Sequence, residues 1–262
     1  MGETERGGRA GVLETVALEN SFLRVNLLPS LGGKIASIQL KPGGDELLQQ
    51  PLLPYASRSQ YMRFDASDAS GWDECLPSVA ACEMKTPSGI ARIPDHGDFW
   101  QVEWQVVSKG KQSASLSADG FSLPLRFGKA LQLEEDTLRI SYSLENTGVR
   151  PVAYIWSTHP LFAVDAEDRI LLPDSVKEVT VEGSAGNRLG LAGTKQSWPR
   201  ATPNSGTSYD LSIVGKPDDG IGDKLFAAAP PEGWCAIERR RLGCRVEFQF
   251  DPRILTHLGL WI

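Results

Sequence analysis

The segments GWDECLP (residues 71–77) and IPDHGDFW (residues 93–100) carry the densest chemistry in the sequence. Each brings aromatic rings, carboxylates and turn-forming Gly or Pro together within a few residues. This mixture is typical of functional loops on a rigid scaffold rather than of a helix or a regular strand. We therefore expect residues 63–100 to cross one sheet as loops and short strands, and to line a polar cleft with an aromatic wall.

Alternating apolar and polar residues extend outward from this region, and a period of two predicts half-buried antiparallel strands. No segment of ten or more residues shows a convincing capped helical stripe. Gly, Ser, Thr and Pro are frequent in residues 183–208, for which we expect a long surface loop. Many short strands between turn signals predict a sandwich or a barrel. The expected strands are residues 22–28, 35–40, 99–107, 113–118, 130–134, 138–144, 152–158, 170–172, 176–181, 224–228, 234–238, 244–250 and 257–262.

Length and composition narrow the class of protein. A chain of 262 residues with 41% hydrophobic residues can form a sizeable core. A net charge of −6 gives no reason to expect a nucleic-acid partner. The chain has no apolar run near the roughly 20 residues of a membrane span. Residues 1–11 lack a signal-peptide pattern, so we expect a disordered tail, one domain over residues 12–262 and a cytoplasmic location.

The four cysteines show neither a C-x-x-C pair nor a metal-ligand spacing. Cys235 and Cys244 could face each other across a hairpin, although a reducing cytoplasm favours free thiols. Cys75 lies inside the first segment, but no histidine is near it in sequence, and we interpret it as a packing residue.

The segments around the first two histidines carry a family resemblance. IPDHGDFW, followed by WSTHPLF (residues 156–162), resembles the aldose 1-epimerase (galactose mutarotase-like) family. That family takes one sugar-site histidine from a DHG loop and a second from a THP or NHP strand end. The resemblance runs from about residue 18 to the last residue. It implies a large antiparallel two-sheet β-sandwich of the galactose mutarotase-like type, a sugar as ligand, and no cofactor or metal.

The resemblance also implies residue roles. Opening a cyclic hemiacetal needs a base for the anomeric hydroxyl proton and an acid for the ring oxygen, and imidazole can serve near neutral pH. His159 would protonate the ring oxygen, while His96 would hydrogen-bond the same region of the sugar. Asp223 resembles the acid that binds ring hydroxyls, although it could instead be a turn residue opening a strand. His257 is interpreted as structural.

Other polar and aromatic residues are candidates for binding the sugar. Arg63 and Glu74 could bind vicinal hydroxyls, since bidentate groups suit diols. The alternative is that they form a buried ion pair with each other. Three tryptophans could stack on a sugar face, although any given Trp is more often a core residue. They are Trp72, Trp100 and Trp156.

The end of the sequence affects the expected activity. In the resembled family, a strand ending L-x-L-W-I precedes strands that carry the general base, a Glu in an L-E-P motif. LGLWI (residues 258–262) matches that strand and ends the sequence. We therefore expect a C-terminally shortened, catalytically weak or inactive form, with Glu74 as the candidate substitute base.

Three functions follow from these observations. The first is interconversion of the α and β anomers of a hexose. The second is carbohydrate binding without turnover, and the third is an interaction sandwich whose histidine motifs arise by chance. A phosphorylated sugar ranks lower, because it would need extra Arg or Lys at the pocket, for which we consider only Arg58 and Arg63 as candidates.

Overall fold

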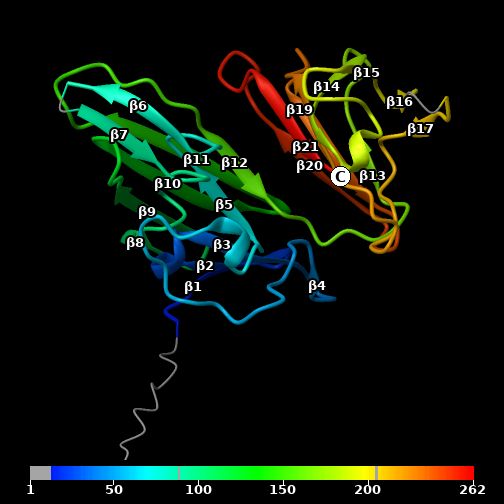
Figure 1. Cartoon of the computed structure of the whole chain (residues 1–262). Helices are drawn as coiled ribbons and strands as arrows, with labels where there is room; N and C mark the ends of the chain where they lie inside the picture. The colour runs from blue at the N-terminus through cyan, green and yellow to red at the C-terminus, as the bar shows by residue number, and fades with distance from the viewer. Residues whose placement is uncertain (1–12, 88, 204–205) are drawn as a thin grey trace, which may run out of the picture. The chain divides into compact units, whose positions relative to one another are not determined.

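The computed structural model describes residues 13–87, 89–203 and 206–262. They form two compact units, one ending at Ala163 and the other beginning at Val164. Antiparallel strands build both units (Figure 1), so the predicted all-β antiparallel fold is confirmed. The predicted tail, residues 1–11, lies outside the described residues. The single domain over residues 12–262 stays a prediction.

The first unit contains a six-stranded sheet, a four-stranded sheet and a separate hairpin. The six-stranded sheet has the order β1 (Val16–Glu19), β2 (Leu23–Leu28), β3 (Lys34–Leu40), β5 (Trp72–Cys75) and β12 (Ser157–Pro160), with β4 (Asp45–Glu46) paired to β3. The four-stranded sheet has the order β11 (Thr137–Asn146), β10 (Leu125–Glu134), β9 (Ser113–Asp119) and β8 (Gln105–Lys109). The hairpin is β6 (Cys82–Thr86) with β7 (Gly89–Ile93).

Buried aromatic side chains organise the interior of this unit. Phe127 on β10 lies 5.4 Å from Phe99 and 5.7 Å from Trp104 between ring centroids, in edge-to-face geometry. Such pairs stabilise a core beyond the area that they bury. Alternate positions of β10 are buried, as a strand with one solvent-facing side requires.

The second unit has its own sheets and its own apolar core, which includes Val179, Val181 and Leu225. Its four-stranded sheet has the order β15 (Lys195–Ser197), β14 (Glu178–Ser184), β18 (Asp223–Ala228) and β21 (His257–Trp261). The other strands are β13 (Arg169–Leu171), β19 (Trp234–Arg239) and β20 (Cys244–Gln249) in one sheet, and β16 (Arg200–Ala201) with β17 (Tyr209–Asp210) in another.

Helical structure is limited to short 3-10 turns among the described residues, as the lack of capped helical stripes predicted. They are η1 (Pro29–Leu31), η2 (Phe64–Ala66) and η3 (Ala185–Asn187). In the described part of the chain, no helix is long and apolar enough to cross a membrane.

Several sequence predictions differ from the structure, and the following differences bear on the site or on its surroundings. The strand predicted over residues 99–107 begins only at Gln105. The apolar residues before it, Phe99, Trp100 and Trp104, are buried in an irregular segment. In this segment, backbone N–H groups donate hydrogen bonds to the carbonyls of Asp98 and Pro29. Residues 152–156 precede β12 rather than belonging to it. The described part of residues 183–208 is not simply a loop, since it contains η3, β15 and β16.

Candidate functional site

β5 pairs with β12 (Figure 1), and the polar side chains of these two strands lie on two opposite faces of the sheet. The antiparallel register places His159 opposite Asp73 and Thr158 opposite Glu74. Directly opposed residues share a face, and successive residues alternate between faces. Asp73, Cys75 and His159 therefore lie on one face, which we call the histidine face. Glu74 and Thr158 lie on the other.

His96 reaches the histidine face through the loop between β7 and residue 98. Its backbone N–H donates to the Val79 carbonyl at 2.9 Å, and its φ is +62°. The next residue, Gly97, forms an isolated parallel bridge with Leu76, directly after β5. This bridge places the loop against the end of β5 and brings His96 beside Cys75.

Only glycine fits this contact. Gly97 has φ +72°, and a Cβ at this position would lie 2.1 Å from the Leu76 carbonyl oxygen. That oxygen also accepts the Asp98 N–H at 2.7 Å, so the backbone has little room to move. The glycine of the DHG motif therefore has a steric cause: it allows the loop to approach β5 closely.

Replacing Gly97 with alanine is expected to destabilise the protein by at least 1–3 kcal/mol, the approximate cost of a strained backbone, with the carbonyl clash added. Gly44→Ala is the matched control, because Gly44 has φ +79° but a Cβ added there would meet no atom within 4 Å. Urea unfolding of both variants separates the two effects. Equal losses of stability would mean that the contact with Leu76 is unimportant.

Three ligating side chains meet on the histidine face. The ligating atoms of Cys75, His96 and His159 all lie within 4.8 Å of one another. The two imidazole rings have centroids 5.2 Å apart and cross at 70°. Cys75 is buried, whereas both histidines are partly exposed. The structure thus brings together the two histidines of the sequence motifs and adds a thiol.

Aromatic rings and a carboxylate orient the two imidazoles. Phe64 in η2 stacks on His96 at 3.9 Å between centroids and meets His159 edge-on at 5.6 Å. The Nδ1 of His96 lies 2.8 Å from the Asp95 carboxylate. The indole of Trp100 donates to the Asp95 carbonyl at 3.2 Å. Stacking and hydrogen bonding together restrict the His96 ring.

A buried charge network adjoins this face. The Lys34 ammonium lies 2.5 Å from Asp73 and 3.0 Å from Asp68, and Asp68 also pairs with Arg58 at 2.5 Å. Burial alone would raise the pKa of Asp68, but Lys34 and Arg58 hold that pKa below its ordinary value. Among the described residues, no group hydrogen-bonds to Oδ1 of Asp73. Asp73 is only 2% exposed, so this unbonded oxygen is also buried.

Glu74 is not brought to the histidines. It lies on the opposite face and is fully buried, where the indole of Trp156 donates to it at 3.1 Å and the Tyr142 hydroxyl at 3.0 Å. Lys129 lies 3.5 Å away. Burial raises the pKa of Glu74 and lowers the pKa of Lys129, although each partner opposes the other's shift. The expected reach of Glu74 to the same ligand therefore fails, because strand alternation turns it away.

The remaining predicted residues are dispersed. Arg63 pairs with Asp65 rather than with Glu74, and its side chain is 78% exposed. Trp72 is buried and donates to the Thr158 hydroxyl on the face opposite the histidines. The indole of Trp156 bonds Glu74 on that same face, and Trp100 is fully buried. Stacking of these rings on a sugar face stays a prediction.

Asp223 belongs to the second unit, where it is the first residue of β18. It is fully buried, accepts a hydrogen bond from the Ser184 hydroxyl at 2.6 Å, and pairs with Arg188. Its part in sugar binding stays a prediction. His257 opens β21 on the surface of the same unit. The four cysteines, all of them described residues, form no disulfide.

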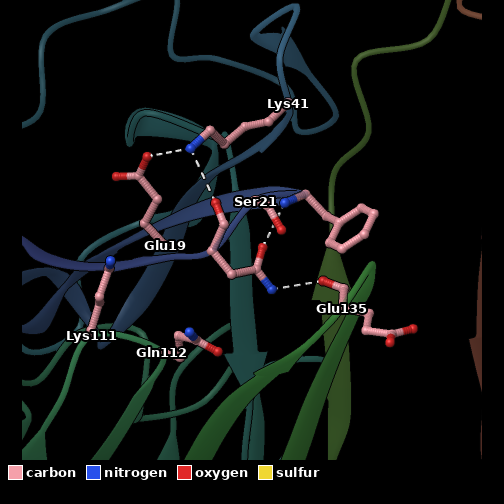
Figure 2. Close-up of a pocket in the computed structure, with 8 residues that line it drawn as sticks. Glu19, Ser21, Lys41, Lys111, Gln112 and Glu135 are labelled. Atoms are coloured by element: carbon pink, nitrogen blue, oxygen red, sulfur yellow. Dashed lines mark hydrogen bonds and ion pairs between the residues drawn. The ribbon is translucent and has the colours of Figure 1, made fainter.

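A polar hollow elsewhere in the first unit is a second candidate (Figure 2). It has a volume of about 550 Å³. Its polar groups are largely bonded to one another, since Lys41 donates to Glu19 at 2.6 Å and the Asn20 amide donates to the Glu135 carbonyl at 2.7 Å. The predicted site residues do not line it. We therefore place the candidate site at the histidine face.

Sequence reasoning missed three members of this site: Asp73, Cys75 and Phe64. The one available signal was alternation within residues 72–75, which puts Asp73 and Cys75 on the same side of any strand. It could not say which side His159 would share, because that depends on the register between β5 and β12.

Comparison with known proteins places this geometry in a fold. No family model matches the sequence. A 77-residue segment is 34% identical to the uncharacterized protein YphB of Escherichia coli K12, and it covers 29% of this chain and 27% of that protein. The matched segment thus spans about a quarter of this relative, too little to show a family.

Solved structures match over nearly the whole chain. Slr1438 of Synechocystis sp. PCC 6803 has a TM-score of 0.70 at 16% identity, with 96% of this chain and 81% of that chain covered. A galactose mutarotase related enzyme of Lactobacillus acidophilus has a TM-score of 0.68 at 15% identity, with 95% and 80% covered. An Escherichia coli K12 protein provisionally assigned as an aldose 1-epimerase has a TM-score of 0.56 at 18% identity, with 95% and 87% covered. The chain has the galactose mutarotase-like fold, as its sequence motifs predicted.

Proposed function

We propose that the protein binds a cyclic hexose at the histidine face and interconverts its α and β anomers by acid and base catalysis. The observation that carries this proposal is the meeting of His96 and His159, whose rings lie 5.2 Å apart between centroids. Partly exposed imidazoles can exchange protons with a bound hydroxyl and a ring oxygen. The fold shared with galactose mutarotase-like proteins supports this choice of reaction.

In this proposal, His159 donates a proton to the ring oxygen as the bond from that oxygen to the anomeric carbon breaks. A base removes the anomeric hydroxyl proton, and an open-chain aldehyde forms. Rotation about the bond between the first two carbons then allows the ring to close on the other face, with both protons returned. His96 hydrogen-bonds the reacting region of the sugar.

Asp73 is the carboxylate that could accept the hydroxyl proton. It shares the histidine face, and its Oδ1 has no bonded partner among the described residues. Glu74 does not suit this role, because it lies on the face opposite the histidines. Asp73 thus takes the place that the sequence offered to Glu74.

A second function, carbohydrate binding without turnover, is favoured by the charge pairing of Asp73. Lys34 lies 2.5 Å from its other carboxylate oxygen, so this carboxylate is already engaged in a buried ion pair. A carboxylate of this kind can still accept a hydroxyl hydrogen bond.

The deciding experiment follows α-D-glucose and α-D-galactose to equilibrium by polarimetry, with and without the protein. We expect faster interconversion than in buffer alone. Tryptophan fluorescence during sugar titration is the parallel measurement. Binding without acceleration would leave the second function, and neither binding nor acceleration would exclude both.

A further inference from the structure

Cys75, His96 and His159 offer a metal ion one sulfur and two imidazole nitrogens within 4.8 Å of one another. We propose that these three residues form a zinc site on the histidine face. The inference goes beyond anomer interconversion, which needs no metal. It also departs from the expectation, drawn from the sequence, that the protein binds no metal. The three ligands come from separate parts of the chain, so they form no spacing that could be recognised in the sequence.

The fold holds the three ligands from two sides. Cys75 and His159 share a face of the β5–β12 pair and are diagonal neighbours in its register. His96 arrives from a separate loop, which the bridge between Gly97 and Leu76 holds against the end of β5. The three are therefore set by backbone contacts on both sides, as a metal site on rigid elements requires.

The ligand set favours zinc over other common ions. Thiolate and imidazole suit Zn²⁺, whereas Mg²⁺ and Ca²⁺ take oxygen ligands. Zinc–sulfur and zinc–nitrogen bonds are about 2.3 and 2.0–2.1 Å long, so zinc binding would draw the three ligand atoms closer than their present separations of up to 4.8 Å. Three protein ligands leave a fourth position for water or another small ligand.

Asp95 supports the site by hydrogen bonding to one of the proposed ligands rather than to the metal. Its carboxylate lies 2.8 Å from Nδ1 of His96. If Nδ1–H donates to Asp95, Nε2 of His96 keeps its lone pair for the metal. Metal-bound histidines commonly donate their other ring N–H to a carboxylate in this way. Phe64, stacked on His96 at 3.9 Å, limits rotation of the ring.

Zinc and sugar would use the same imidazoles. A histidine nitrogen bound to zinc cannot carry a proton to a ring oxygen. Zinc binding is therefore expected to inhibit any anomer interconversion, and a chelator to restore it. This link rests on the proposed function, but the binding itself does not.

The test uses reduced, metal-free protein, with zinc titrated against a chromophoric chelator and cobalt used as a spectroscopic substitute. We expect one zinc per chain and a cobalt–thiolate charge-transfer band. Cys75→Ser should remove the band, and His159→Gln should weaken zinc binding strongly. Asp95→Asn should weaken zinc binding about 10- to 100-fold, the usual effect of losing a carboxylate that hydrogen-bonds a metal-binding histidine. Cys82→Ser and His257→Gln, at exposed residues, are the matched controls.

The outcomes separate the two proposals. Absence of stoichiometric zinc binding, or binding unchanged in Cys75→Ser, would overturn the zinc site and leave the anomer reaction standing. Equal weakening in Cys82→Ser would also overturn it, since it would show adventitious binding by thiols. Zinc bound at this site by a protein with no anomer interconversion would support the zinc site and refute the enzyme.

Discussion

Replacing His159 with glutamine is expected to reduce the rate of anomer interconversion by about 10²–10⁴-fold, the usual contribution of a general acid or base. Glutamine keeps a similar size and a hydrogen-bonding end but cannot transfer a proton. The residue lies on β12, in contact with the edge of Phe64. The measurement is polarimetry or NMR exchange at saturating sugar, with unfolding followed in parallel.

Two further variants test whether the loss of activity is specific to His159. Glu74→Gln is expected to keep most of the activity, because its side chain lies on the face opposite the histidines and bonds Trp156 and Tyr142. His257→Gln changes an exposed histidine of the second unit and should have no effect. If Glu74→Gln remained folded and lost as much activity as His159→Gln, our assignment of the two faces to separate roles would be wrong.

The general architecture could be predicted from the sequence because it depends on local patterns. Alternation of apolar and polar residues predicted β2, β3, β9, β11 and β18 to β21 closely. The scarcity of helix was predicted because no long segment combines a helical apolar period with capping residues. Alternation failed over residues 99–104, where buried aromatic rings fill a core from an irregular backbone. Local spacing cannot distinguish those two uses of an aromatic residue.

The candidate site was only partly predictable because it depends on long-range register. The motifs identified His96 and His159, and the structure brings them together. They gave no means of deciding between Asp73 and Glu74, since either neighbour could have faced the cleft. Pairing with β12 decides this: His159 opposes Asp73, and Glu74 is turned towards Lys129 and Tyr142. Cys75 was missed for the same reason.

The charge network beside the site is expected to be the most sensitive part of the unit's stability. Lys34 is fully buried and bonds the Ser70 carbonyl, with Asp68 and Asp73 as its ionic partners. Removing one partner of a buried ion pair leaves an uncompensated charge away from water. The site depends on this network, because Asp73 belongs to both.

Lys34→Met is therefore expected to lower the free energy of unfolding by about 3–5 kcal/mol. Lys41→Met is the matched control: its pair with Glu19 has side chains 33% and 41% exposed, and such surface pairs contribute about 0–1 kcal/mol. Urea unfolding measures both. A loss below about 1 kcal/mol for Lys34→Met would contradict the prediction, because the buried ion pair would then contribute no more to stability than an exposed one.

The pH dependence and a double variant test the cause of that loss. Since the pKa of Asp68 is lowered on folding, its contribution to stability is present above the unfolded pKa and disappears as the pH falls through the folded value. The wild type should therefore lose stability in acid, and Lys34→Met should lose less over the same range. Adding Asp73→Asn to Lys34→Met removes the stranded charge, so we expect part of the stability to return. If the double variant were less stable than Lys34→Met by the full effect of Asp73→Asn alone, the two side chains would be energetically independent.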